Sequence, residues 1–194
     1  MSWFNRVSVH YAIFCIASLF SISVSAAYTE SVDGDLSGDF LAPTLIATTS
    51  GSNIITGSIG DNGNTGATNG QDADYFSFDL AANETLTEIN ILSFLGSNNV
   101  SFFGYVEDSA FNGQGFPDLD GSAFINDSSG NIINSLIGGS ITDTRISFWL
   151  QETAPVQVDY SIEFVIATTP VPVPGAIWFF ATSICGLVMV KRKR

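Results

Sequence analysis

Apolar side chains recur at every second position along much of the middle of this chain. Phe76, Phe78 and Leu80 share one face of the segment 74–80, and the segment 145–151 alternates in the same way. Successive side chains of a β-strand point to opposite faces of a sheet, so a period of two predicts half-buried strands. The segment 158–166 shows the same pattern and predicts a third strong strand.

Weaker alternation predicts further strands, and clusters of Gly, Asn, Asp and Ser separate them. These segments are 41–48, 53–59, 86–94, 100–106 and 132–137. No stretch before residue 169 shows helical periodicity. About eight short strands predict an all-β fold, specifically an antiparallel β-sandwich of jelly-roll or immunoglobulin-like order, because half-buried faces must pair across a core.

Charge is divided between the ends and the middle of the chain. All 19 Asp and Glu residues lie between Glu30 and Glu163, whereas Arg145 is the only Lys or Arg between residues 28 and 169. Nucleic acid is therefore excluded as a partner, because phosphate contacts require basic side chains. The same middle region contains no Cys and no His, so it has neither a disulfide nor a Ser-His-Asp or Cys-His arrangement.

The N-terminus has the pattern of a secretory signal peptide, predicted to span residues 1–27. Arg6 provides the positive charge, 11–20 is the apolar stretch, and small residues follow it. Cleavage by signal peptidase is predicted after Ala26 or Ala27. The acidic region 28–168 then forms the exported domain.

The C-terminal segment 169–194 combines a Pro-containing motif, an uncharged helix predicted over 175–190 and a basic end. The whole uncharged stretch 171–190 has the ~20 residues needed to span a bilayer. The basic end predicts a cytoplasmic membrane stop by the positive-inside rule. It consists of Lys191, Arg192, Lys193 and Arg194.

This tail resembles a PEP-CTERM sorting signal in its VPLPA-like variant. The motif residues are Val171, Pro172, Val173, Pro174, Gly175 and Ala176. Val173 replaces the Glu of the parent motif, and Gly175 replaces the Ala usual in the variant. The resemblance implies recognition and processing by an exosortase-type enzyme near the prolines. A plain single-pass anchor is the alternative.

The middle of the chain resembles the bacterial pre-peptidase C-terminal β-sandwich family. Asp72 and Asp74 form an acidic pair before a strand of the Tyr/Phe-x-Phe type, and the segments 146–152 and 158–165 are similar to the last two strands of such domains. The resemblance covers roughly residues 30–166 and implies a non-catalytic accessory module.

Acidic loops suggest a weak calcium site at Asp61, Asp72 and Asp74, since calcium takes oxygen ligands that clustered carboxylates supply. Asp33 and Asp35 lie in an earlier acidic loop. The alternative is turn chemistry, in which Asp bonds its own backbone. Calcium is the only cofactor that the residues suggest.

Trp149 is the candidate for stacking on a sugar ring, because alternation places it opposite the face of Phe148. The alternative is burial of Trp149 beneath a loop. A two-carboxylate glycosidase has little support, because among 19 acids some close pair is inevitable.

These observations predict an exported bacterial cell-surface or matrix protein, not an enzyme, with a structural or adhesive role. Its precursor is held in the inner membrane by the C-terminal helix, and extracellular polysaccharide is a candidate partner. The alternative is a carbohydrate- or calcium-binding module on a simple anchor.

Overall fold

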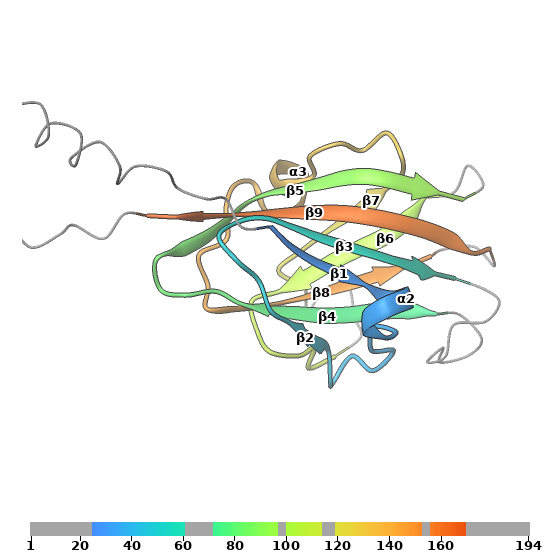
Figure 1. The fold of residues 1–194 in the computed structure, drawn as a ribbon, viewed down its shortest axis with the longest axis horizontal. Coiled ribbons are helices and arrows are strands. Elements are labelled where there is room, and N and C mark those ends of the chain that lie inside the picture. The colour runs from blue at the N-terminus through green and yellow to red at the C-terminus, as the bar shows by residue number, and fades with distance from the viewer. Residues whose placement is uncertain (1–24, 61–71, 97–99, 114–118, 153–155, 170–194) are drawn as a thin grey trace, which may run out of the picture.

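The computed structural model describes residues 25–60, 72–96, 100–113, 119–152 and 156–169. Over these residues the chain forms strands and two short helices, shown in Figure 1. The elements in chain order are β1 (Ala26–Thr29), α2 (Glu30–Asp33), β2 (Thr44–Ile46), β3 (Gly51–Ile59), β4 (Ala73–Asp79), β5 (Glu84–Leu95), β6 (Ser101–Val106), β7 (Gly121–Ile125), α3 (Ile133–Ile137), β8 (Arg145–Gln151) and β9 (Val158–Thr168).

The strands form two sheets. Sheet A has the order β1-β3-β9-β5, and sheet B has the order β2-β4-β8-β6-β7. The all-β prediction is therefore confirmed. The prediction of purely antiparallel pairing is wrong, because β1 runs parallel to β3 and β2 runs parallel to β4. Alternation in one strand carries no information about the direction of its neighbour, which explains the error.

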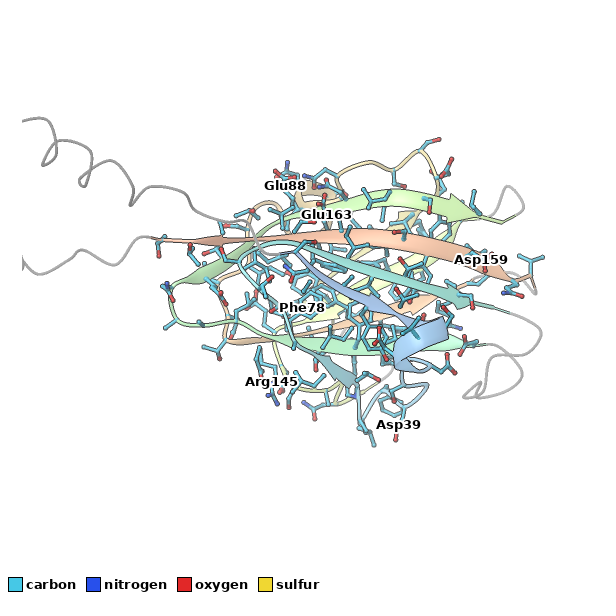
Figure 2. All side chains as sticks on the ribbon, viewed as in Figure 1. Asp39, Phe78, Glu88, Arg145, Asp159 and Glu163 are labelled. Atoms are coloured by element: carbon cyan, nitrogen blue, oxygen red, sulfur yellow. The ribbon has the colours of Figure 1, made fainter. Side chains whose placement is uncertain are left out.

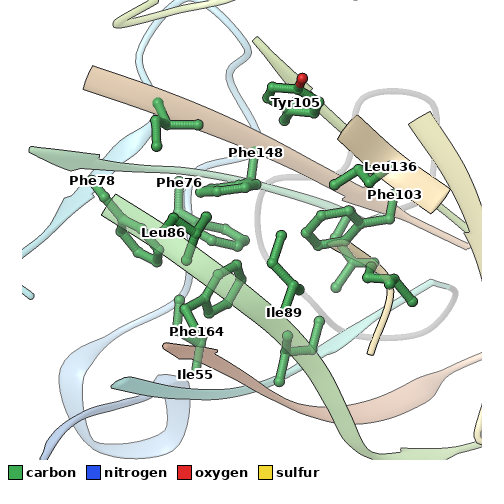
Figure 3. Close-up of a cluster of buried hydrophobic side chains, with 14 of the residues drawn as sticks. Ile55, Phe76, Phe78, Leu86, Ile89, Phe103, Tyr105, Leu136, Phe148 and Phe164 are labelled. Carbon is green, nitrogen blue, oxygen red and sulfur yellow. The ribbon is translucent and has the colours of Figure 1, made fainter. Parts of the chain in front are cut away.

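One aromatic-rich core lies between the two sheets (Figure 3). Phe76 and Phe78 of β4 and Phe148 of β8 point from sheet B toward Phe164 of β9 in sheet A. The ring centroids of Phe78 and Phe164 are 4.9 Å apart at an interplanar angle of 90°. Edge-to-face pairs of this kind add about 0.5–1.5 kcal/mol beyond the burial of their area. The alternating aromatic residues therefore join the two layers.

A second aromatic cluster covers the outer face of sheet B. Tyr75, Phe102 and Trp149 occupy the outward positions of three adjacent strands, and Phe111 from the following loop packs over them. The backbone N–H of Phe111 donates to the carbonyl of Phe40, which ties two covering loops together at 3.0 Å. The outer face of this sheet is thus closed where these rings lie.

The strong alternating segments are strands at nearly their predicted bounds, but 132–137 is not a strand. The structure has the helix α3 there, with Ile132, Ile133 and Leu136 buried. Its end is set by Gly138, which adopts φ 72° and donates its N–H to the Asn134 carbonyl. Glycine tolerates this left-handed conformation without a steric penalty. The sequence prediction also missed β1, α2 and β7.

The described part of the chain begins and ends at the same end of sheet A. Asn53 of β3 has Ala26 as its register partner on one side and Phe164 on the other. The end of β9 and the start of β1 therefore lie at the same end of sheet A, with β3 between them. Figure 1 shows α2 toward the opposite end of the sandwich.

Candidate functional site

Three carboxylates from separate parts of the chain meet beside α2. Glu30, Asp35 and Asp74 each provide a carboxylate oxygen, and these oxygens all lie within 4.8 Å of one another. Glu30 begins α2, Asp35 lies two residues after this helix, and Asp74 is on β4 of sheet B. Asp74 is buried, Glu30 is half-buried and Asp35 is exposed. The cluster therefore extends from the interior of the sandwich to its surface.

Asp74 occupies a core-facing position of its strand. It shares the strand face of Phe76 and Phe78, and its side chain is 0% exposed. Tyr160 of β9 points inward from sheet A, and its hydroxyl donates to Asp74 Oδ2 at 2.5 Å. The other oxygen, Oδ1, is buried and has no hydrogen-bond partner among the described residues. A buried carboxylate oxygen that lacks a partner is costly, because burial removes its hydration.

Glu30 covers the Asp74 carboxylate from the side of the N-terminal segment. Its Oε2 accepts the Ser58 backbone N–H at 2.8 Å, and its Oε1 accepts the Leu36 N–H at 3.4 Å. Gly57 leaves space for this carboxylate. A Cβ at Gly57 would lie 2.5 Å from Glu30 Cδ and 2.7 Å from the Tyr160 hydroxyl. The missing side chain is therefore what lets Glu30 rest against β3.

Local hydrogen bonds shape the segment that carries Glu30 and Asp35. The Tyr28 hydroxyl donates to the Gly34 carbonyl at 2.8 Å, and the Thr29 N–H donates to Asp33 Oδ2 at 2.8 Å. Gly34 has φ 107°, which favours glycine, and it turns the chain after α2. This turn brings Asp35 back toward Glu30. We call residues 26–37 the N-terminal hook.

Electrostatics in the cluster favour protonation. Burial raises the pKa of Glu30 to about 7. The backbone hydrogen bonds to its carboxylate oppose this rise, and the charges of Asp35 and Asp72 add to it. Burial and the Glu30 charge raise the pKa of Asp74 well above its ordinary value. Burial and Asp74 likewise raise the pKa of Tyr160. Each shift means that negative charge is poorly tolerated here.

Among the described residues no basic side chain compensates the cluster. Arg145 is the only Lys or Arg between residues 28 and 169, and it pairs with Asp79. Asp79 is at the far end of β4 from Asp74, which at about 3.3 Å per residue places the pair roughly 16 Å along the strand. Figure 2 shows Arg145 away from α2. The carboxylates consequently repel one another without a counter-charge from the part of the chain that the structure describes.

The carboxylate cluster shares only one residue with the predicted acidic site of Asp61, Asp72 and Asp74. Asp74 belongs to the cluster, whereas Asp61 lies outside the described residues. Asp72 is buried, and its backbone pairs with Gly60. It is not one of the three grouped carboxylates, but its charge raises the pKa of Asp74 and of Glu30. Sequence reasoning missed Glu30 as a site residue. The sequence did carry a signal for Asp74, because this residue falls on the same alternating face as Phe76 and so points inward.

The predicted stacking face of Trp149 is not exposed. Its side chain is 9% exposed, and its ring stacks on Tyr75 at a centroid distance of 5.7 Å and meets Phe102 edge-on at 4.7 Å. The indole N–H donates to Gln151 Oε1 at 3.1 Å. The expectation of an accessible Trp149 is thus corrected: loop residues such as Phe111 close the outer face of sheet B.

Most of the remaining predicted residues are outside the described part of the chain. These are the apolar leader, the sorting motif 171–176, the helix 175–190 and the basic end 191–194. Among the described residues, no helix has both the length and the apolar character needed to cross a membrane. Ala26 and Ala27, predicted at the signal cleavage site, are the first two residues of β1.

The chemistry of the cluster is that of hard oxygen donors. Carboxylates are acceptors when ionised and suit cations such as calcium. The hydroxyl of Tyr160, which donates to Asp74, also stands beside them. Comparison of the chain with protein-family models, curated proteins and solved structures gives no match.

Proposed function

We propose that this chain is an exported cell-surface protein, sorted through its C-terminal tail, with a structural or adhesive body. The observation that carries the proposal is the arrangement of the chain ends. The described sandwich begins at Ala26 and ends at Thr169 beside the same end of sheet A. A leader removed at the start of β1 and a tail attached after β9, at the same end of sheet A with β3 between the two strands, leave the rest of the body free to project from the surface.

This arrangement also gives the body an orientation. The backbone N–H of Ser58 donates to Glu30. Ser58 is seven residues along β3 from Gly51, and Gly51 pairs with Ile166 near the end of β9, where the tail begins. At about 3.3 Å per residue that separation is roughly 23 Å. The acidic cluster therefore faces away from the membrane in the tail-attached precursor.

The proposed partners are signal peptidase for the leader and an exosortase-type enzyme for the motif 171–176. Extracellular polysaccharide is the proposed surrounding material, and the mature form is at the cell surface or released. The proposal assigns no catalysis to the body. Its support is that residues 28–169 contain no His and no Cys.

Intact-mass measurement of the mature protein tests the proposal. The chain is expressed in a host with an exosortase and in a matched strain without it. We expect a surface form that has lost its leader and, only in the first strain, the basic end. Replacing Pro172 and Pro174 by Ala should preserve the tail, whereas Pro43→Ala in the body should be processed normally. A mature form that retains Lys191–Arg194 in both strains would leave a simple anchor.

A second candidate function is a calcium-binding module held by a single-pass anchor. The observation that favours it is the group formed by Glu30, Asp35 and Asp74. We do not propose carbohydrate stacking at Trp149, because neighbouring side chains cover its ring. Retention of the mature protein on polysaccharide stays a test of the adhesive role.

A further inference from the structure

We propose that Glu30, Asp35 and Asp74 bind one calcium ion, which fastens the N-terminal hook to the end of the sandwich. This inference rests on the second candidate function, calcium binding, and is independent of how the chain is sorted, because the ligands all lie in the folded body. The site also differs from the site predicted from the loop 60–74, since two of its three ligands come from the hook.

The spacing of the three carboxylates matches a single ion. Calcium binds oxygen at about 2.3–2.6 Å, so two ligands on opposite sides of one ion are at most about 5.2 Å apart. The grouped oxygens of Glu30, Asp35 and Asp74 lie within 4.8 Å of one another. One ion can therefore contact all three without rearrangement of the backbone. Magnesium demands near-ideal octahedral geometry and gives up its waters reluctantly, so a cage of protein carboxylates suits calcium better.

The burial of Asp74 is the independent observation that points to a ligand. Its side chain is 0% exposed, and its Oδ1 has no hydrogen-bond partner among the described residues. Buried carboxylates are normally paired or bound to a metal. Arg145, the only base of the body, is engaged with Asp79. A bound cation supplies the missing partner for Oδ1 and the missing positive charge.

The positions of the ligands define what the ion does. Asp74 belongs to β4 of sheet B and is bonded to Tyr160 of sheet A. Glu30 and Asp35 belong to the hook, which pairs with β3 of sheet A through only four residues of β1. The ion thus joins the hook to Asp74 of sheet B and, through the Asp74–Tyr160 hydrogen bond, to sheet A. Loss of the ion leaves repelling carboxylates at that junction and loosens the hook.

Titration of the full chain in detergent with Ca²⁺ tests the site. Calcium sites in extracellular modules bind with dissociation constants of about 10⁻⁴–10⁻³ M. At about 100 times the dissociation constant, binding should raise the melting temperature by roughly 5–10 °C over the value in chelator. Tb³⁺ is the second probe, because the ring of Tyr160, whose hydroxyl is bonded to Asp74, can excite its emission. We expect saturation at one Tb³⁺ per chain and displacement by Ca²⁺.

Asp74→Asn and Asp159→Asn form a matched pair of variants. Both remove one negative charge from a strand, but Asp159 is exposed on the outer face of β9 next to Tyr160 (Figure 2). Asp74→Asn should abolish the calcium-dependent rise in melting temperature and the Tb³⁺ emission, and Asp159→Asn should keep both. In chelator Asp74→Asn should melt at or above the wild-type temperature, which shows that it folds.

Glu30→Gln separates binding by the hook from binding by acidic surface in general. It should lower the Tb³⁺ emission, and in calcium it should expose the hook to limited proteolysis at the rate seen for wild type in chelator. Equal calcium responses of wild type and Asp74→Asn would overturn the proposal. So would a melting temperature of the wild type that is the same in calcium and in chelator. An equal response to Mg²⁺ would remove the assignment to calcium.

Discussion

Gly57→Ala is the substitution that most directly tests the position of Glu30. The added Cβ would lie 2.5 Å from both Cδ and Oε2 of Glu30, and 2.7 Å from the Tyr160 hydroxyl. Favourable contacts between heavy atoms begin near 3.5 Å, so the Glu30 carboxylate must move by about 1 Å. The hydrogen bond from Ser58 N–H to Oε2, now 2.8 Å, would then lengthen to about 3.8 Å, beyond hydrogen-bond range.

The expected cost follows from two opposing contributions. Losing a hydrogen bond to a charged group costs about 1.5–3 kcal/mol. Replacing a glycine within a strand by alanine returns about 0.5–1 kcal/mol, because the unfolded chain loses conformational freedom. The free energy of unfolding in calcium should therefore fall by about 1–2 kcal/mol, or roughly 2–8 °C in melting temperature. In chelator the loss should be smaller, because the displaced Glu30 carboxylate also moves away from Asp74.

Urea denaturation of wild type, Gly57→Ala and Gly139→Ala measures this effect. Gly139 is the matched control, since a Cβ there would meet nothing within 4 Å. Its replacement should leave the unfolding free energy unchanged or raise it slightly. The urea dependence of the free energy should be the same for all three chains. If the two alanine variants unfold at the same urea concentration in both buffers, Glu30 does not rest on Gly57.

Three further predictions concern the core, the covered indole and the metal-free site. Phe78→Ala should lower the unfolding free energy by about 3–5 kcal/mol in urea, whereas Phe124→Ala, at a 64% exposed position, should change it by roughly 0.5 kcal/mol or less. Trp149→Ala should destabilise by about 3–5 kcal/mol and leave polysaccharide retention per folded molecule unchanged; selective loss of retention would restore a sugar site. In chelator, burial leaves the pKa of Glu30 at about 7 and raises the pKa of Asp74, so the folded chain binds these protons more tightly than the unfolded chain. Their stabilisation is complete below the unfolded pKa of about 4 and is lost as pH rises through the folded pKa. The melting temperature should thus fall from about pH 5 to about pH 8, and Glu30→Gln should flatten the decline; a rise over this range would contradict the reasoning.

The strands with strong alternation were predictable because alternation is a local property. The segment 145–151 was predicted as a strand and is β8 at the same bounds. The segment 132–137 was not distinguishable from a strand, because five helical residues complete little more than one turn. Its helical character depends on Gly138 and on the packing of Leu136 beneath sheet B's edge strand, since α3 contacts β7.

The acidic character of the body and its single base, Arg145, follow from the sequence alone. The inward direction of Asp74 also follows from it, because Asp74 shares the alternation of Phe76 and Phe78. The meeting of Asp74 with Glu30 was decided only by the tertiary structure. It requires β1 to pair in parallel with β3, Gly34 to turn the hook, and Gly57 to leave room for a carboxylate. Each of these is a contact between segments distant in the chain or a turn that such contacts orient, and a local period in the sequence does not encode it.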